Sequence, residues 1–581
     1  MYDGDPPGGM HAGIPFVKKV NLSDNISLEV MQIEEHSYIQ INNKNEIPVN
    51  GTINFTVREF YTDTLQFSFS KNINLSTHSS YAFRLPVALY HRQIISANFR
   101  LQDGNQKIDL SAVPPYNLTP PPSPFPRINS PDVFGLRPGS PIQFKIAASG
   151  LNPKKYFVKN LPKGLTIDSL TGILSGKLNE PGDYQMLVKV QNEAGIAAQY
   201  FTIRCGNSIA LTPPMGWNSW NCWGTSVSDA KVRSAADALI EKGLVDHGWS
   251  YINIDDGWEA ASRAPNGTII SNEKFPDMKA LGNYLHTQGL KYGIYSSPGP
   301  RTCGNYLGSY RHEAQDAASY SDWGIDYLKY DWCSYGEIHN NDTALASFKA
   351  PYKLMQDELR DQPRDILYSL CQYGMREVWK WAPEVDANCW RTTGDIIDTW
   401  NSLFSIGFSQ ERLSKYASPG RWNDPDMLIV GNVGWGENLH PTHLSPDEQY
   451  LHISLWCLLS APLLIGCDIA AIDLFTNNLL TNDEVLAINQ DNAGNQAKAL
   501  LQTKDIQIWA KKLTNGDYAI GVFNVGNEHL YYTINFDELN LGAKSYNVRD
   551  LWRQLDLGQF TKMKARIASH GVLLLRIQGI K

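Results

Sequence analysis

Charged side chains lie in pairs near the ends of four short apolar segments of this sequence. They are Asp255 with Asp256, Lys329 with Asp331, Arg391 with Asp395, and Asp424 with Asp426. Any one of these Asp residues could cap a helix or join a structural ion pair. Six carboxylates with two cations among them indicate a shared site, because the cations offset the mutual repulsion that would otherwise raise every carboxyl pKa.

Two carboxylates with different roles are what hydrolysis of a glycosidic bond requires, one as nucleophile or base and one as acid. Lys329 and Asp331 are two residues apart on a predicted strand and therefore point to the same side. We expect the lysine to keep Asp331 ionised and nucleophilic. Asp395 would be the acid, which requires a raised pKa, and the charge of Asp331 on the opposite face could raise it.

A divalent metal ion is the rival use for so many carboxylates, since oxygen ligands suit calcium and magnesium. The spacing lacks the D-x-[DN]-x-[DN]-G pattern of a calcium loop, and Lys329 and Arg391 would oppose a cation. The 13 His residues form neither an HExxH motif nor a paired-ligand pattern. We therefore expect no metal and no cofactor.

The elements that must position these side chains alternate between short apolar strands and helical stretches from Leu211 onward. Spacings of about 30 to 40 residues fit one strand plus one helix, and eight such units close a (β/α)8 TIM barrel with its active site at the carboxyl ends of the strands. Two helical stretches are SDAKVRSAADALIEKGL, which opens on a Ser-Asp cap, and DEQYLHISLWCLLSA. The eight predicted strands begin at Met215, Tyr251, Lys291, Tyr327, Ile366, Cys389, Arg421 and Leu463.

The rest of the chain is β-rich, so we predict a multidomain protein. Residues 1–115 form an N-terminal domain of alternating strands with no readable motif, and residues 116–131 form a Pro-rich linker that should be extended. Residues 132–206 resemble an immunoglobulin-like β-sandwich, a type of module that more often supports a neighbour than binds sugar. The barrel covers residues 207–495, and an antiparallel β-sandwich domain covers 496–581.

Composition excludes some partners. The hydrophobic share of 42% and the net charge of -8 are typical of globular proteins without a basic surplus, so we expect no nucleic-acid partner. No apolar run approaches the ~20 residues that a membrane span needs. The 16 Trp and 28 Tyr residues could stack on sugar rings or pack between layers. The sequence carries no pattern that fixes an oligomeric state.

Five motifs in the barrel region together resemble glycoside hydrolase family 27, the α-galactosidases and α-N-acetylgalactosaminidases. In chain order they are LTPPMGWNSWN, YINIDDGW, YLKYDWC, CWRTTGD and RWNDPDM, and the likeness runs from about Leu211 to Asp491. The resemblance implies a retaining exo-α-galactosidase in which Asp331 is the nucleophile and Asp395 the acid/base. It also implies carboxyl groups about 5 to 5.5 Å apart.

The same resemblance implies the substrate contacts. Asp255 and Asp256 would accept hydrogen bonds from the 6- and 4-hydroxyls of galactose, and the axial 4-hydroxyl is what distinguishes this sugar. Trp217 would wall the pocket and Met427 would add an apolar surface. Cys303 and Cys333 match a family disulfide beside the pocket. The remaining predicted sugar contacts are Tyr295, Lys329, Gln372, Arg391 and Asp426.

Several positions depart from the family pattern. Gln372 stands where members commonly have Glu, and with Met375 it is too bulky for an N-acetyl group, which favours galactose over N-acetylgalactosamine. Gly257 replaces a Cys, so Cys222 loses that partner. Cys371 and Cys389 could pair with each other. The two remaining cysteines that we assign to the core are Cys457 and Cys467.

Other functions stay open on these residues. A β-L-arabinopyranosidase would favour a longer Glu in place of Asp256, and an α-N-acetylgalactosaminidase would need smaller residues near Gln372. A non-catalytic galactose-binding protein on the same scaffold would not need both Asp331 and Asp395. We expect a galactose-containing glycan as substrate. Eight cysteines favour a secreted or periplasmic protein whose signal peptide has been removed, since the first residues do not resemble one.

Overall fold

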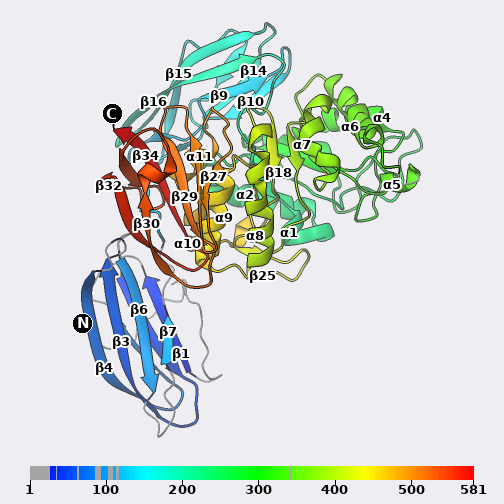
Figure 1. Ribbon diagram of the computed structural model, residues 1–581. Coiled ribbons are helices and arrows are strands. Elements are labelled where there is room, and N and C mark those ends of the chain that lie inside the picture. The colour runs from blue at the N-terminus through cyan, green and yellow to red at the C-terminus, as the bar shows by residue number, and fades with distance from the viewer. Residues whose placement is uncertain are drawn as a thin grey trace.

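The computed structural model describes residues 26–33, 36–59, 61, 64–84, 93–101, 109–112, 117–339 and 342–580. Residues 1–25 of the predicted N-terminal domain and residue 116 of the predicted linker lie outside these ranges. Four units follow one another in the described parts of the chain (Figure 1). Two β-rich units precede a parallel barrel, and an antiparallel β domain follows it.

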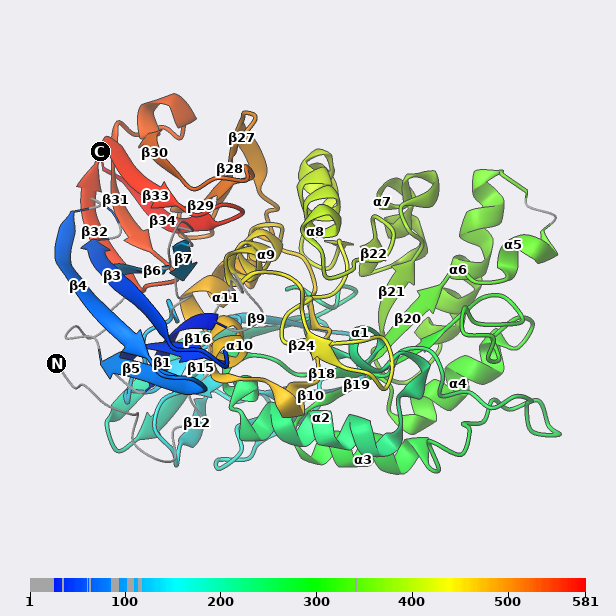
Figure 2. The same cartoon turned by 90° about the horizontal axis from the view of Figure 1, so that it is seen from below.

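Eight parallel strands form the barrel and confirm the predicted architecture. The first and last neighbours in the sheet, β23 and β26, are joined through Leu428, whose backbone N–H donates to Leu464 O at 2.8 Å. Helices α2, α3, α4 and α6 lie outside strands β18 to β21 (Figure 2). In sheet order the strands are β23 (Trp422–Asp424), β22 (Cys389–Arg391), β21 (Leu367–Cys371), β20 (Tyr327–Asp331), β19 (Lys291–Ser296), β18 (Tyr251–Asn253), β17 (Met215–Asn218) and β26 (Leu463–Ile465).

Several barrel helices begin at residues whose side chains cap the first turn. The side chain of Ser228 accepts a hydrogen bond from Lys231 N at the start of α2, and Ser445 with Glu448 forms a capping box at the start of α9. Each cap satisfies backbone donors that the first turn leaves unpaired. The helices of this region are α1 (Trp220–Trp223), α2 (Asp229–Glu241), α3 (Met278–Thr287), α4 (Glu313–Trp323), α5 (Tyr335–Ile338), α6 (Leu345–Arg360), α7 (Val378–Trp381), α8 (Trp400–Gly407), α9 (Pro446–Leu458), α10 (Leu474–Leu480) and α11 (Asp483–Asn489).

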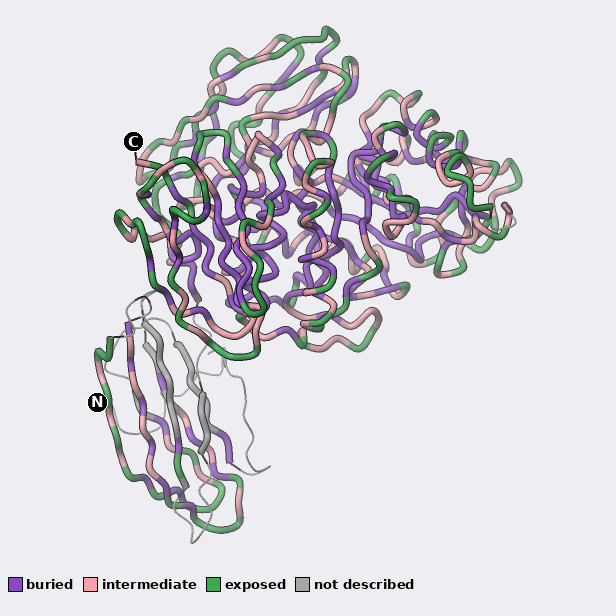
Figure 3. Tube along the Cα trace, viewed as in Figure 1, coloured by how far each residue is buried: buried purple, intermediate pink, exposed green. Residues whose placement is uncertain are grey.

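Tryptophans dominate the largest fully buried side chains, and most of them pack between the strands and helices of the barrel. Burial of one such ring removes about 150–250 Å² from water and stabilises the fold by roughly 4 to 6 kcal/mol before entropic costs. Figure 3 shows the buried residues concentrated in the barrel and the C-terminal domain. Much of the aromatic content therefore serves packing. Within the described residues, the helices lack the length and apolarity required to cross a bilayer.

The C-terminal domain is an antiparallel sandwich, as predicted. One sheet has the order β27 (Lys498–Gln502), β28 (Ile506–Lys512), β29 (Tyr518–Asn524), β34 (Val572–Ile580), β31 (Ser545–Asp550) and β32 (Leu555–Phe560). The second pairs β30 (Leu530–Asn535) with β33 (Lys562–Ile567). Alternate residues such as Ile534, Val548 and Met563 fill the space between the sheets. The segments DIQIWAKKL, DYAIGVFNV and HLYYTINF contain β28, β29 and β30.

The immunoglobulin-like module packs against the barrel at the amino ends of its strands. Arg137 Nε lies 2.5 Å from Asp365 Oδ1 just before β21, and Lys154 Nζ lies 2.8 Å from Asp246 Oδ2 just before β18. The module is thus held on the face opposite the carboxyl ends. Its strands are β8 (Arg127–Ile128), β9 (Val133–Leu136), β10 (Pro141–Lys145), β11 (Ala148–Ser149), β12 (Lys155–Lys159), β13 (Leu165–Ile167), β14 (Ile173–Lys177), β15 (Gly182–Asn192) and β16 (Gly195–Cys205).

The Pro-rich segment lies against the barrel domain. The backbone N–H of Leu118 donates to the hydroxyl of Tyr450 at 3.0 Å, and Thr119 Oγ1 donates to Asn478 O at 3.0 Å. Before this segment, two antiparallel sheets enclose a core that includes Ile53. Their strands are β1 (Ile26–Ile33), β2 (His36–Asn43) and β5 (Ser79–Arg84) in one sheet, and β4 (Leu65–Leu75), β3 (Val49–Glu59), β6 (Gln93–Leu101) and β7 (Asp109–Ala112) in the other.

Candidate active site

The predicted charged residues gather at the carboxyl ends of the barrel strands. Asp331 is the last residue of β20 and lies opposite Cys371 at the end of β21. Arg391 ends β22 and lies opposite Asp424 at the end of β23. Since parallel strands all end at the same rim, side chains far apart in sequence meet there.

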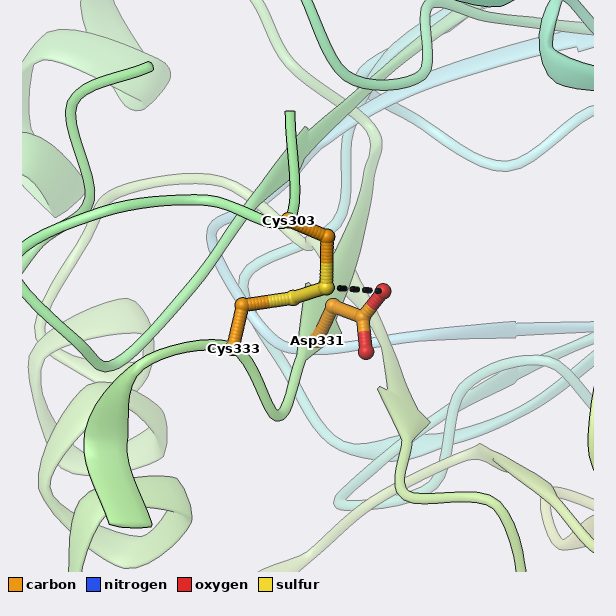
Figure 4. Close-up of side chains that lie close together, drawn as sticks. All are labelled: Cys303, Asp331 and Cys333. Atoms are coloured by element: carbon orange, nitrogen blue, oxygen red, sulfur yellow. Dashed lines mark hydrogen bonds between the residues drawn. A yellow bond between two sulfur atoms is a disulfide. The ribbon is translucent and has the colours of Figure 1, made fainter. Parts of the chain in front are cut away.

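Asp331 is a buried carboxylate held at both oxygens. Its Oδ2 accepts a hydrogen bond from the Tyr295 hydroxyl at 3.0 Å, and its Oδ1 accepts one from the Tyr373 hydroxyl at 2.6 Å. The Sγ of Cys303 lies 4.0 Å from Oδ2, with Cys333 behind it (Figure 4). Only 4% of Asp331 is exposed, so these contacts fix the orientation of a group that could attack a substrate.

Burial raises the pKa of Asp331 above its ordinary value, because water no longer stabilises the charge. The charge of Lys329 and the hydrogen bonds from Tyr373 and Tyr295 act in the opposite direction and oppose this rise. The predicted influence of the lysine on Asp331 is therefore present, and two tyrosine hydroxyls join it.

Lys329 makes its direct contact with Asp255. The Nζ of Lys329 donates to Asp255 Oδ2 at 2.8 Å, and the same oxygen accepts a hydrogen bond from Asn218 Nδ2 at 2.8 Å. Burial by itself lowers the pKa of Lys329, but the charge of Asp255 reverses the effect and raises that pKa well above its ordinary value. The lysine is held cationic within reach of the rim.

Arg391 links two carboxylates on the other side of the rim. Its Nη2 donates to Asp395 Oδ1 at 2.9 Å, and its Nη1 lies 3.0 Å from Asp426 Oδ1. Asp426 also accepts a hydrogen bond from the backbone N–H of Ile396, so the segment that carries Asp395 is tied to it. The backbone of Asp426 has φ of 89°, a conformation that non-glycine residues rarely adopt and that is common at functional sites.

The expected raised pKa of Asp395 is wrong for this state of the protein. Burial raises the pKa of Asp395, but the cations of Arg391 and Lys329 outweigh it, so the net pKa lies below the ordinary value. The side chain of Asp395 is 56% exposed, and water still solvates part of it. The guanidinium of Arg391 is bonded directly to Asp395 and lowers its pKa, a contact that spacing along the sequence does not show.

Asp256 and Gln372 are among the side chains at the rim with buried polar atoms that have no hydrogen-bond partner in the described residues. Asp256 Oδ2 accepts from Gly304 N at 2.5 Å, but its Oδ1 is unpartnered. The amide oxygen and nitrogen of Gln372 are both unpartnered as well. Burial raises the pKa of Asp256 to about 6. Buried polar groups in native proteins are nearly always satisfied, so these atoms indicate a polar ligand.

The two predicted apolar contacts are part of the barrel core. Trp217 is fully buried, and its indole N–H donates to Cys467 O at 2.8 Å. Met427 is 3% exposed and belongs to the same core. Their packing against the rim is a structural role, and contact with a sugar stays a prediction for both.

The cysteines divide into one close pair and single buried thiols. The sulfur atoms of Cys303 and Cys333 lie at disulfide distance, beside Asp331. Cys371 and Cys389 are separate thiols, because Cys389 begins its strand opposite Ser369 and so lies two residues away from Cys371 along the sheet. The other separate thiols among the residues discussed above are Cys222, Cys457 and Cys467, all fully buried.

Sequence reasoning missed two residues that hold the site. Tyr373 binds Asp331, and it reaches the carboxylate from a backbone with φ of 55°. Asn218 ends β17 and binds Asp255. A signal for Asn218 was present, since it ends a predicted strand like the charged residues. For Tyr373 the turn after β21 has no pattern that fixes its direction.

The arrangement can perform acid and base chemistry without a metal ligand set of its own. Among the described residues, the group of metal-binding atoms that includes one of the two predicted catalytic carboxylates is Asp331 with Cys303 and Cys333. The sulfur atoms of Cys303 and Cys333 lie at disulfide distance from each other. A metal would need them as thiolates, which a disulfide does not provide. The site therefore offers a fixed, buried carboxylate, Asp331, and a more exposed one, Asp395. The cation of Lys329 acts on both groups, and the cation of Arg391 acts on Asp395.

Three families match successive parts of the chain. Residues 212–491 match the family described as alpha galactosidase A, and residues 503–577 match the alpha galactosidase C-terminal beta sandwich domain. Residues 125–206 match the He_PIG family of Ig domains. The matches therefore cover the barrel, the domain after it and the module before it.

Similar proteins come from plants and bacteria. The α-galactosidase of Cyamopsis tetragonoloba is 39% identical over 392 residues, which are 66% of this chain and 91% of that protein. Alpha-galactosidase A of Cellvibrio japonicus is 37% identical over 68% of this chain and 96% of that protein. A crystal structure of a candidate α-galactosidase from Bacteroides fragilis superposes with a TM-score of 0.73 at 36% identity, over 79% of this chain and 99% of that one. With its barrel motifs and strand-end carboxylates, the chain belongs to the α-galactosidase family, glycoside hydrolase family 27.

Proposed function

We propose that this protein is a retaining exo-α-galactosidase that removes terminal α-linked galactose from glycans by double displacement. The observation that carries the proposal is the contrast between its two carboxylates. Asp331 is buried with both oxygens held by tyrosine hydroxyls, and Asp395 is half exposed and bound to one cation. A nucleophile needs the first environment, and an acid/base that exchanges protons with water needs the second.

In the first step, an oxygen of Asp331 attacks the anomeric carbon while the bond to the leaving oxygen breaks. The proton of the Asp395 carboxyl moves to that leaving oxygen, so the aglycone departs as an alcohol and a glycosyl ester with Asp331 remains. In the second step, Asp395 takes a proton from water. The resulting hydroxide equivalent attacks the same carbon, the ester bond breaks, and Asp331 is released with overall retention of configuration.

The electrostatics of the site fit this exchange of roles. Tyr295, Tyr373 and Lys329 favour the charged form of Asp331. A bound sugar would cover the exposed side chain of Asp395 and exclude water from it. Because water then no longer stabilises the charge, the pKa of Asp395 would rise. Once Asp331 becomes an ester its charge disappears, so the pKa of Asp395 falls and the group can act as a base.

The choice of galactose rests on Asp255, Asp256 and Gln372. The free Oδ1 of Asp256 can accept a hydroxyl hydrogen, and the amide of Gln372 offers one donor and one acceptor. Lys329 fixes Asp255 beside them. The bulk of Gln372 at its buried position supports a sugar with a free 2-hydroxyl.

The test is a panel of aryl α-galactoside, α-N-acetylgalactosaminide and β-L-arabinopyranoside substrates, with the first anomer released followed by NMR. We expect the α-galactoside to react at least about tenfold faster, which corresponds to ~1.4 kcal/mol in the transition state. The first product should be α-galactose. Initial release of the β anomer would exclude double displacement, and hydrolysis of none of the substrates would favour a sugar-binding protein.

We propose in addition that Cys303 and Cys333 form a disulfide and that the protein works in a secreted or periplasmic setting. The position of the two sulfur atoms supports the bond, and disulfides persist in oxidising compartments. Fractionation of cells that produce the protein tests the location, with activity in the cytoplasmic fraction alone as the contrary result.

A further inference from the structure

Two histidines and a carboxylate converge outside the catalytic network, close to the segment that bears Asp395. Asp398 comes just before the N-cap of α8. His440 lies in the short strand β25 (His440–Pro441), which pairs with β24 (Asn432–Val433), and His443 follows it. One ligand atom from each of the three lies within 4.8 Å of the others.

The distances suit a small metal ion. Asp398 Oδ2 lies 2.7 Å from His443 Nδ1 and 4.0 Å from His440 Nδ1. Zinc bonds of about 2.0–2.2 Å in tetrahedral geometry place neighbouring ligand atoms roughly 3.4 Å apart. The two observed distances bracket this value, so small side-chain rotations would bring all three atoms onto one ion.

The carboxylate is held in place before any ion arrives. Asp398 has a side chain only 8% exposed, and its Oδ2 accepts a hydrogen bond from the backbone N–H of His443 at 2.9 Å. In this state His440 Nδ1 donates to Pro441 O at 3.0 Å, and a metal ion on Nδ1 would replace this hydrogen bond. The two imidazole rings stack with centroids 4.7 Å apart. The bond from His443 to Asp398 and the stacking of the two rings therefore hold both histidines beside one carboxylate.

We propose that Asp398, His440 and His443 form a binding site for a divalent late-transition-metal ion, with Zn²⁺ as the fitting example. Imidazole nitrogens select zinc, copper and nickel, whereas calcium takes six to eight oxygen ligands. Three protein ligands leave the fourth tetrahedral position open to water, consistent with the side-chain exposures of 40% and 68% for the two histidines.

Such an ion would join two segments of the catalytic rim. Asp398 lies three residues after Asp395, and the histidines belong to the segment between β24 and α9. The expectation of no metal rested on the missing calcium and HExxH patterns and on the two cations, Lys329 and Arg391, among the rim carboxylates. His440 and His443 lie far from Asp398 in the sequence, so spacing does not connect them. The fold supplies that partner by placing the start of α8 beside β25.

Isothermal titration of the untagged, chelator-treated full chain with ZnCl₂ tests the proposal. We expect one Zn²⁺ per chain, with affinity reduced about tenfold or more in His443→Ala and in Asp398→Asn, the range seen when residues that support a metal are removed. His78→Ala is the matched control, because His78 contacts Glu46 at 3.1 Å without a second histidine. Its affinity should equal that of the wild type.

The contrary results are equally specific. A wild type that titrates no ion, or variants that bind zinc as tightly as the wild type, would overturn the site. Equal binding of CaCl₂ would do so too, because it would indicate general attraction to acidic groups. Thermal unfolding of each variant without metal serves as the folding check, and added ZnCl₂ should raise the midpoint of the wild type and of His78→Ala but not of His443→Ala.

Discussion

Replacement of Tyr373 by Phe removes one of the two hydroxyls that hold Asp331. The Tyr373 hydroxyl donates to Asp331 Oδ1 at 2.6 Å, and this hydrogen bond lowers the pKa of the carboxyl. Without it, the protonated form of Asp331 is favoured. The nucleophile is active only when ionised, so activity should be lost at higher pH values than in the wild type.

The size of the effect follows from the type of bond. A hydrogen bond to a charged group contributes about 1.5–3 kcal/mol, and 1.36 kcal/mol corresponds to one pKa unit. The acidic limb of kcat/KM, which reports groups of the free enzyme, should therefore move upward by about 1 to 2 pH units. Activity still falls toward low pH in the variant, but the pH at which it falls is higher than in the wild type.

The assay is kcat/KM for an aryl α-galactoside as a function of pH. Tyr330→Phe is the matched control, because Tyr330 is also buried on this part of the barrel and its hydroxyl has no hydrogen-bond partner among the described residues. Its profile should coincide with that of the wild type. An acidic limb that stays in place in Tyr373→Phe, or moves to lower pH, would refute the role that we assign to the hydroxyl.

Three further predictions concern the site and the interfaces. Asp331→Asn should reduce turnover by roughly 10⁴-fold with unchanged thermal unfolding, because it removes a nucleophile and keeps the shape; near-normal rates would contradict its role. A thiol titration of the denatured protein should find two fewer thiols before reduction than after it if Cys303 and Cys333 are bonded, and equal counts would show that they are not. Arg137→Ala should lower the free energy of unfolding by about 2–3 kcal/mol in urea, whereas Arg204→Ala, from an exposed pair, should change it by less than ~0.5 kcal/mol; equal effects would contradict a role for burial.

The strands of the barrel were predictable because each has a short apolar run followed by polar residues at its carboxyl end. The predicted starts at Met215, Tyr251 and Lys291 coincide with those of β17, β18 and β19. Caps such as Ser228 marked helix starts in the same direct way. These signals are local, and the closure of the barrel then brings the ends together.

What the sequence left out depends on contacts between strands. Spacing placed Lys329 beside Asp331 on one strand, but the shortest contact of the lysine crosses to Asp255. The pKa of Asp395 depends on the guanidinium of Arg391 at 2.9 Å, a distance that spacing does not supply. Tyr373 binds from an unusual backbone conformation. The pKa values of the site residues therefore depend on distances between side chains of neighbouring elements.

The docking of the immunoglobulin-like module beneath the barrel has a practical consequence for immobilised enzyme. Its contacts through Arg137 and Lys154 are made at the amino ends of the strands, whereas Asp331 stands at a carboxyl end. If the enzyme is coupled to a resin through the outer surface of this module, the active site will face away from the support. Large, branched glycans will then reach the bound enzyme without obstruction from the matrix.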